Sequence, residues 1–240
     1  MRDWGVMRWL VAQRSNEDIF IFELITLPGD LIVIAIALAA LLLWELNRAR
    51  NFSQAEGYLL PPNVWSLIAI IVGGLSLIVA LESLFALNRP PEELRAVAAS
   101  PYSFPSGHTM AATVTWAAIA WWHRPQHRPV RIALVFGVVA AVGLARMALG
   151  LHYLPDILAG IGFGVLYLFI ARLITFQRPK HAFDLAIIMA TAAAVLSGAS
   201  SRGILAFIGT LVWFAIWRTL EHPTCRSWIR SHWGRDSTIQ

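Results

Sequence analysis

Long runs of apolar residues constrain the fold of this chain more than any other feature of its sequence. About seven stretches carry few charges, at approximately 29–46, 64–88, 107–122, 130–149, 155–174, 183–198 and 203–218. A helix needs about 20 apolar residues to cross about 30 Å of hydrocarbon. Inside a membrane, the helix also satisfies every backbone polar group within its own segment. The pattern predicts an all-α polytopic transmembrane bundle of six to seven spans.

The number of spans has one open alternative. The stretch 107–122 is short, and 183–198 and 203–218 are short and joined by a polar segment, so these last two could form a shallow hairpin. We expect a transmembrane domain over 29–218. An amphipathic segment precedes it at 1–28, and a basic cytoplasmic tail follows it at 219–240.

The composition agrees with a membrane protein. Hydrophobic residues make up 58% of the chain and charged residues only 14%, whereas soluble domains average about 25% charged residues. A soluble enzyme and a disordered regulator are therefore excluded. The single cysteine, Cys225, excludes an internal disulfide.

The basic residues lie between the apolar runs, which predicts an orientation in the membrane. The smaller set is Arg2, Arg8, Arg14, Arg95 and Arg202, and the larger set is Arg48, Arg50, Arg124, Arg128, Arg131, Arg178, Lys180, Arg218, Arg226, Arg230 and Arg235. Cytoplasmic loops carry the excess of Lys and Arg. We therefore expect a protein of the cell membrane, with the smaller set outside. The net charge of +5 reflects this orientation rather than binding to nucleic acid.

Two segments outside the spans are predicted to be helical. Residues 16–27 begin with Asn16 and two acids and then bring several apolar side chains forward, which fits a helix on the membrane surface or one packed on the bundle. Residues 90–99, with Pro91 followed by two glutamates, predict a short surface helix that covers the functional site described below.

Ionisable residues gather at span ends on the predicted outer side. Arg89 follows the second span, His108 opens the third, Arg146 ends the fourth, and His152 and Asp156 lie where the fifth begins. Ionisable groups at membrane depth are costly and by default mark a functional site. We therefore expect these five residues to form one site.

Their chemistry fits phosphoryl transfer. Two guanidiniums and the backbone N–H groups of the Ser106–Gly107 turn form a site for a phosphate. His152 and Asp156 are four residues apart, on one helical face. If Asp156 accepts from one ring nitrogen, the other can act as nucleophile or base. His108 could protonate a leaving alkoxide. Such a reaction depends on positioning and charge, so we expect no metal and no cofactor.

The motifs in these connections resemble those of a known family. The chain reads R-P at 89–90, P-S-G-H at 105–108 and R-x5-H-x3-D at 146–156. This ordered set is similar to the signature of the type 2 phosphatidic acid phosphatase superfamily, which also includes the vanadium haloperoxidases. The resemblance covers roughly residues 64–175, and it implies the helical core of that family.

The resemblance also implies a role for each site residue. His152 would attack phosphorus to form a phosphohistidine, and Asp156 would orient the imidazole. His108 would protonate the leaving group and then activate water. The phosphate oxygens would be held by Arg89, Ser106, Gly107 and Arg146.

Two positions depart from the family pattern. Glu82 stands where the family usually has Lys, and Ala145 stands where it usually has Ser. An ionised carboxylate close to a phosphate would repel it. Glu82 could be protonated, paired with Arg95 or Arg146, or adapted to a different substrate.

The residues and the resemblance together predict a metal-independent membrane phosphatase acting on the phosphate monoester or diphosphate of a lipid. Phosphatidic acid, phosphatidylglycerol phosphate and polyprenyl diphosphates all fit a site that a lipid reaches by lateral diffusion. One alternative is a phosphotransferase that uses the same pocket. Another is a catalytically impaired lipid-binding protein, which Glu82 favours.

Overall fold

The described part of the chain consists of helices and their connections. The computed structural model describes residues 5–51, 58–122, 128–175 and 178–236, and these contain no strand. Two short 3-10 helices occur, Leu27–Gly29 and Glu92–Leu94. The α-helices are α1 (Val6–Gln13), α2 (Asp18–Thr26), α3 (Leu31–Asn51), α4 (Pro62–Phe85), α5 (Gly107–Trp122), α6 (Arg128–Ala148), α7 (Leu154–Thr175), α8 (Pro179–Leu196), α9 (Ser201–Leu220) and α10 (Pro223–Asp236).

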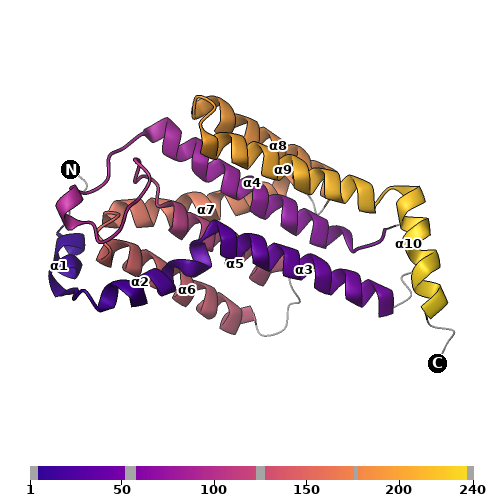
Figure 1. Ribbon diagram of the computed structural model, residues 1–240, viewed down its shortest axis with the longest axis horizontal. Helices are drawn as coiled ribbons and strands as arrows, with labels where there is room; N and C mark the ends of the chain where they lie inside the picture. Colours follow the sequence, from indigo (N-terminus) through magenta and orange to yellow (C-terminus); the bar gives the residue numbers. More distant parts are fainter. Residues whose placement is uncertain (1–4, 52–57, 123–127, 176–177, 237–240) are drawn as a thin grey trace.

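The long helices run along the long axis of the molecule around α4 (Figure 1). Helix α4 packs against α8, α9 and α5, and α5 in turn packs against α6 and α7. Helices α1 and α2 lie at one end of the bundle, and α10 lies at the other. The connections that carry the predicted site residues lie at the α1 end.

Six of these helices are long and apolar enough to cross a membrane, which agrees with the predicted six to seven spans. They cover Leu31–Arg50, Pro62–Phe85, Pro129–Ala148, Leu154–Thr175, Pro179–Leu196 and Ser201–Leu220. Because α8 and α9 contain 18 and 20 residues, their lengths do not support the shallow hairpin. Helix α5 has 16 residues, about 24 Å at 1.5 Å per residue, and lies among α4, α6 and α7.

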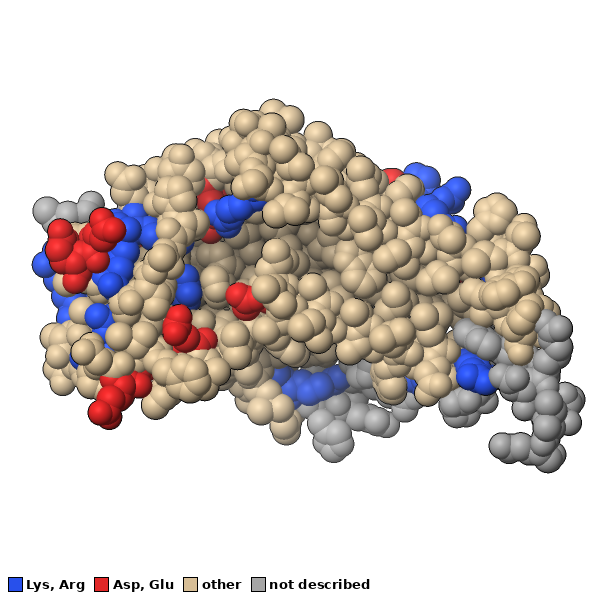
Figure 2. Space-filling view, in the orientation of Figure 1, with Lys and Arg blue, Asp and Glu red and all other residues tan. Residues whose placement is uncertain are grey.

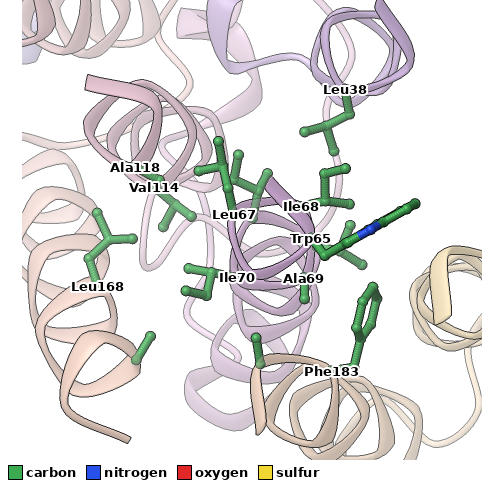
Figure 3. Close-up of a cluster of buried hydrophobic side chains, with 14 of the residues drawn as sticks. Leu38, Trp65, Leu67, Ile68, Ala69, Ile70, Val114, Ala118, Leu168 and Phe183 are labelled. Carbon is green, nitrogen blue, oxygen red and sulfur yellow. The ribbon is translucent and has the colours of Figure 1, made fainter. Parts of the chain in front are cut away.

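Helix α4 is the centre of the hydrophobic core because it is apolar on every face. Every residue from Val64 to Gly74 is buried. Figure 3 shows side chains of α4 meeting those of the surrounding helices, among them Leu38, Val114, Leu168 and Phe183.

A glycine lets α7 and α8 approach α4 closely. A Cβ atom at Gly73 would lie 2.6 Å from the hydroxyl oxygen of Tyr167 and 3.0 Å from Cα of Ala186. The Tyr167 hydroxyl donates to the carbonyl of Ile70 at 2.8 Å. The hydroxyl group of Tyr167 therefore has a hydrogen-bond partner within the bundle.

The outer surface of the bundle is apolar, as expected for helices that face lipid. Phe136 on α6 is 73% exposed and Val195 on α8 is 71% exposed. A soluble protein rarely exposes so many large apolar side chains.

The segments outside the spans differ in part from the predictions. Helix α2 packs on α6 while Phe20 remains exposed, so it combines features of both alternatives. The predicted helix over 90–99 is wrong. Only Glu92–Leu94 forms a single 3-10 turn, and Arg95 has extended backbone. The bond from Arg95 Nε to the carbonyl of Pro90 helps to hold this turn.

The basic residues described in the structure follow the bundle ends as expected. Arg14 donates to the carbonyl of Ala148 at the site end of α6, whereas Arg218 lies at the far end of α9. Arg2 and Arg124 lie outside the described residues. Which end faces the cytoplasm stays a prediction from the charge asymmetry.

Candidate active site

Two connections, α4–α5 and α6–α7, meet at the α1 end of the bundle and bring the predicted residues together. The amide of Ala96 donates to the carbonyl of Leu149 at 3.0 Å, which joins the two connections. The amide of Ser106 donates to the carbonyl of Asp156 at 2.9 Å, which fixes the start of α5 against the first turn of α7. Residues far apart in the sequence therefore share one site.

Arg89 is buried at the centre of this site, with 8% of its surface exposed. Its Nη1 donates to the carbonyl of Leu151 and to Nε2 of His152, each at 2.9 Å. Its Nη2 donates to Oγ of Ser100 at 2.9 Å, and its Nε donates to the carbonyl of the same residue. Burial lowers the pKa of Arg89 to about 10, so the guanidinium stays positively charged at neutral pH.

His152 is held as one tautomer by the backbone. Its Nδ1 lies 2.8 Å from the carbonyl oxygen of Ser103 and so donates to it, which leaves Nε2 without a proton. Burial, together with the positive charges of Arg89 and Arg146, lowers the pKa of His152 to about 4. The imidazole is therefore neutral at neutral pH, and the lone pair of Nε2 faces Arg89.

Asp156 lies beside His152 but not in the expected contact. Its Oδ2 is 3.8 Å from Nδ1 of His152, too far for a hydrogen bond. The same oxygen accepts from the amide of Tyr153 at 3.0 Å. The acceptor for Nδ1 is instead the carbonyl of Ser103, which sequence reasoning missed because a backbone carbonyl has no residue signature.

Arg146 supplies a second buried guanidinium at the last turn of α6. It is 8% exposed, and its Nε has no hydrogen-bond partner among the described residues. A buried donor without a partner costs free energy. An anion bound in the site would satisfy this donor.

The first turn of α5 carries the P-S-G-H motif. The side chain of Ser106 is fully buried, and its Oγ shares a hydrogen bond of 2.9 Å with Oγ1 of Thr109. The amide of Ser106 already donates to the carbonyl of Asp156, and phosphate binding by Ser106 and Gly107 stays a prediction. Gly107 and His108 are the first two residues of α5, and both are half-buried.

Glu82 has a partner that the sequence analysis did not consider. Its carboxylate is buried, and its Oε2 lies 2.6 Å from Nη1 of Arg202 at the start of α9. The expected partners were Arg95 and Arg146, but Arg95 donates to the carbonyl of Pro90. Arg202 is one of the cations of the predicted outer side, and it lies at the start of the last span. This position is the sequence signal that could have identified it as a partner of Glu82.

The face drawn in Figure 2 is hollowed near the end of the bundle that holds these connections. Lys and Arg side chains, with Asp and Glu side chains beside them, lie at the edge of the hollow. Within the described part of the chain, no three His, Cys, Asp or Glu side chains come close enough to hold a metal ion. The buried cations of the site are Arg89 and Arg146.

Comparison with known proteins gives a family match. Residues 63–180 match the PAP2 superfamily, which confirms the resemblance seen in the motifs. Phosphatidylglycerophosphatase B of Bacillus subtilis (strain 168) is 36% identical over 80 residues, which are 30% of this chain and 39% of that protein. The chain thus aligns with well under half the length of this relative.

A solved structure shares the fold. It is a transmembrane PAP2-type phosphatidylglycerolphosphate phosphatase from Bacillus subtilis, with a TM-score of 0.58 and 21% sequence identity. The match covers 72% of this chain and 84% of the other. The all-α transmembrane bundle predicted from the sequence is therefore confirmed.

Proposed function

From the PAP2-superfamily region that this chain carries over residues 63–180, we propose a membrane-embedded lipid phosphatase. It hydrolyses the phosphate monoester or diphosphate of a lipid through a phosphohistidine on Nε2 of His152. The observation that carries the proposal is the state of this nitrogen. It has no proton, because Nδ1 donates to the carbonyl of Ser103, and it faces Arg89 at 2.9 Å.

Substrate binding uses the two buried arginines. Phosphate oxygens replace His152 as the partner of Arg89 Nη1, and they also accept from the unpartnered Nε of Arg146. Charge-assisted bonds to phosphate are among the strongest hydrogen bonds in proteins. The exchange frees the lone pair of His152 Nε2 at the moment when the phosphorus atom arrives beside it.

The reaction then takes two displacements. In the first, Nε2 of His152 forms a bond to phosphorus, the bond from phosphorus to the leaving oxygen breaks, and His108, which enters this step as the imidazolium, gives that oxygen a proton and becomes neutral. Burial lowers the pKa of His108 to about 3 without substrate, and the negative charge of the bound phosphate favours its protonated form. In the second, His108 takes a proton from water, the water oxygen bonds to phosphorus, and the P–N bond breaks. Inorganic phosphate leaves, and both histidines return to their first states.

Asp156 acts on this cycle through its charge. Its carboxylate lies 3.8 Å from His152 Nδ1. The imidazole gains positive charge as Nε2 bonds to phosphorus, and a carboxylate at this distance stabilises that charge.

A lipid substrate follows from the position of the site. The charged residues lie at the ends of helices whose outer surfaces are apolar, within reach of a lipid headgroup. The relative of known activity is named for a lipid phosphate, phosphatidylglycerophosphate. Phosphatidic acid and polyprenyl diphosphates have the same chemistry at phosphorus. The charge asymmetry of the sequence supports a site on the extracytoplasmic side of the cell membrane.

The Glu82–Arg202 ion pair weakens the case for a catalytically impaired protein. That alternative was based on Glu82 in place of the family Lys, which puts a negative charge where a positive one is usual. The carboxylate is paired with Arg202 at 2.6 Å. Its negative charge is thus balanced before a substrate enters.

Hydrolysis by purified protein tests the proposal. The assay follows release of inorganic phosphate from phosphatidic acid, phosphatidylglycerol phosphate and a polyprenyl diphosphate in detergent micelles. We expect His152→Ala to lower kcat by at least about 10³-fold, since the nucleophile is lost. The control is His181→Ala, at the far end of the bundle on α8. If wild type and His152→Ala release phosphate equally slowly from all three lipids, the phosphatase proposal fails.

Transfer to an acceptor is tested in the same assay. Adding a lipid alcohol should leave phosphate release unchanged if water is the acceptor. Phosphorylation of the alcohol in place of phosphate release would instead show a phosphotransferase.

A further inference from the structure

We propose that Arg202 binds a second phosphate group of the substrate, next to the phosphate that is hydrolysed, and that Glu82 positions Arg202 for this role. The inference rests on the proposed phosphatase function and narrows its substrate class to lipids that carry two linked phosphates. It assigns a function to α9, whose residues lie beyond the region 63–180 that matches the PAP2 superfamily.

The first argument is the position of Glu82 between the phosphate-binding turn and α9. A Cβ atom at Gly107 would lie 2.8 Å from Oε1 of Glu82, so this oxygen lies against the start of α5. The other oxygen, Oε2, lies 2.6 Å from Nη1 of Arg202. Glu82 therefore connects Arg202 to the P-S-G-H turn.

The second argument is the contrast in exposure among the three arginines. Arg89 and Arg146 are each 8% exposed. The Arg202 side chain is 45% exposed, although its carboxylate partner is 3% exposed. Arg202 is therefore held at Nη1, while nearly half of its side chain stays accessible.

The third argument is the number of donors on Arg202. A guanidinium has five N–H groups, and Glu82 is the partner that the structure shows for Nη1. A single carboxylate cannot use all five donors. The remaining N–H groups can bind phosphate oxygens while the ion pair with Glu82 persists.

The fourth argument is electrostatic and separates Arg202 from the phosphate that reacts. The Glu82 carboxylate contacts Arg202 through Oε2 and lies against the start of α5 through Oε1, so it lies between Arg202 and the P-S-G-H turn. This carboxylate would repel a phosphate oxygen placed against it. A second phosphate, further towards the exposed rim, avoids Glu82 and meets Arg202.

A lipid diphosphate has this arrangement of groups. The terminal phosphate would bind at Arg89 and Arg146, beside His152 Nε2. The inner phosphate, joined to the lipid, would bind Arg202 and would be the leaving group. Arg202 would then also balance the negative charge that the inner phosphate gains when the bridging bond breaks.

Two substrates with the same acyl chains test the proposal, diacylglycerol diphosphate and phosphatidic acid. We expect Arg202→Gln to raise KM for the diphosphate by about 10-fold or more, as for the loss of a charge-assisted bond. KM for phosphatidic acid should change by less than about 3-fold. Arg202→Lys keeps the charge and should restore part of the diphosphate affinity. Arg218→Gln, at the other end of α9, is the control and should change neither KM.

Glu82→Gln tests the positioning role. We expect it to raise KM for the diphosphate by less than Arg202→Gln does, with kcat for phosphatidic acid within about 3-fold of wild type. An equal loss on both substrates would assign Glu82 to the phosphate site itself, and no change on either would make the pair purely structural. Both results overturn the proposal.

Binding of inorganic anions separates this proposal from the phosphatase proposal, because it needs no turnover. Calorimetry compares pyrophosphate with phosphate on wild type, Arg202→Gln and Arg202→Lys. We expect Arg202→Gln to weaken pyrophosphate binding about 10-fold and phosphate binding less than 3-fold. Equal weakening of both anions, or of neither, would overturn the role of Arg202 even where the lipids are hydrolysed. If no lipid is hydrolysed, the phosphatase proposal fails while selective loss of pyrophosphate binding still supports Arg202.

Discussion

Nη1 of Arg89 lies 2.9 Å from Nε2 of His152, and both residues are buried. The same guanidinium is fixed by Leu151 and Ser100. The nitrogen proposed to attack phosphorus is thus hydrogen-bonded to a group proposed to hold the phosphate. Binding of the substrate and release of the nucleophile are coupled by this contact.

Arg89→Lys should lower kcat/KM by about 10²–10³-fold, the usual effect of losing a group that stabilises charge in the transition state. A lysine has one charged nitrogen and cannot bond Ser100, Leu151 and a phosphate with the geometry of a guanidinium. Steady-state hydrolysis of a lipid phosphate measures the effect. Arg95→Lys is the matched control, since Arg95 Nε donates to the carbonyl of Pro90 in its own connection. Comparable activity of Arg89→Lys and wild type would contradict the assigned role.

The His152 imidazole should stay neutral down to about pH 4. Burial disfavours the charged form and lowers its pKa to about 4, so the lone pair of Nε2 is present above that pH and is lost as the pH falls through it. Titration of ¹⁵N-labelled protein without ligand, followed by NMR in micelles, reads this directly. His152→Gln assigns the resonance. A midpoint at or above the ordinary histidine value of about 6.5 would contradict the burial of this side chain.

Asp156→Asn should lower kcat by about 10–100-fold, a smaller loss than that of His152→Ala. The carbonyl of Ser103 holds the tautomer of His152, so Asn removes the charge of Asp156 but leaves Nε2 without a proton. Where the carboxylate itself sets the tautomer, its replacement by Asn costs about 10⁴-fold. Single-turnover kinetics of both variants give the comparison. A loss as large as that of His152→Ala would mean that Asp156, rather than the carbonyl of Ser103, orients the imidazole during the reaction.

The helices were predictable because each apolar run is set by local composition. Helix α4 is apolar on every face, and the structure places it at the centre. The structure differs from the prediction where the sequence pattern for a helix was weaker. Residues 90–99 form only one 3-10 turn, because this segment is held by bonds such as that between Ala96 and Leu149, which local sequence does not encode.

The site residues were predictable as a group, but their partners were not. Arg89, His152 and Asp156 come from motifs with fixed spacing, and the structure brings them together. The Glu82–Arg202 pair joins the end of α4 to the start of α9, and it depends on how two helices distant in the sequence pack. The carbonyl of Ser103 could not be predicted as the partner of His152 for another reason. Every residue has a backbone carbonyl, so the sequence does not single out this one.

Gly160→Ala should disrupt the site through packing. A Cβ at Gly160 would lie 2.9 Å from the backbone carbonyl of Ser106 and 3.3 Å from the amide of Met110, so α7 could no longer approach α5. Overpacking of this kind costs about 1–3 kcal/mol. We expect a lower Tm in detergent and a loss of activity. Gly162→Ala is the control on the same helix, because a Cβ there meets nothing within 4 Å. Equal Tm values for the two variants would contradict the close contact.

Glu221→Gln should destabilise the end of α9 opposite Arg202. The Glu221 carboxylate accepts from the amides of Leu59 and Leu60, at 2.8 and 3.1 Å, and from Nε1 of Trp65 at 2.8 Å. It therefore joins the end of α9 to the start of α4, the same two helices that Glu82 and Arg202 join at the site end. Gln replaces one acceptor oxygen with an amide group that donates, so at least one of these N–H groups loses its partner.

Hydrogen bonds to a charged group contribute about 1.5–3 kcal/mol each, so Glu221→Gln should lower the Tm by several degrees in detergent. The control is Asp184→Asn, whose carboxylate forms an exposed ion pair with Lys180 at 2.8 Å. Exposed pairs contribute little, so its Tm should stay close to that of wild type. Because Glu221 also helps to hold α9 in place, pyrophosphate binding by Glu221→Gln should weaken more than phosphate binding. A stable variant with unchanged binding would show that the contacts of α9 with α4 at the site end suffice to place Arg202.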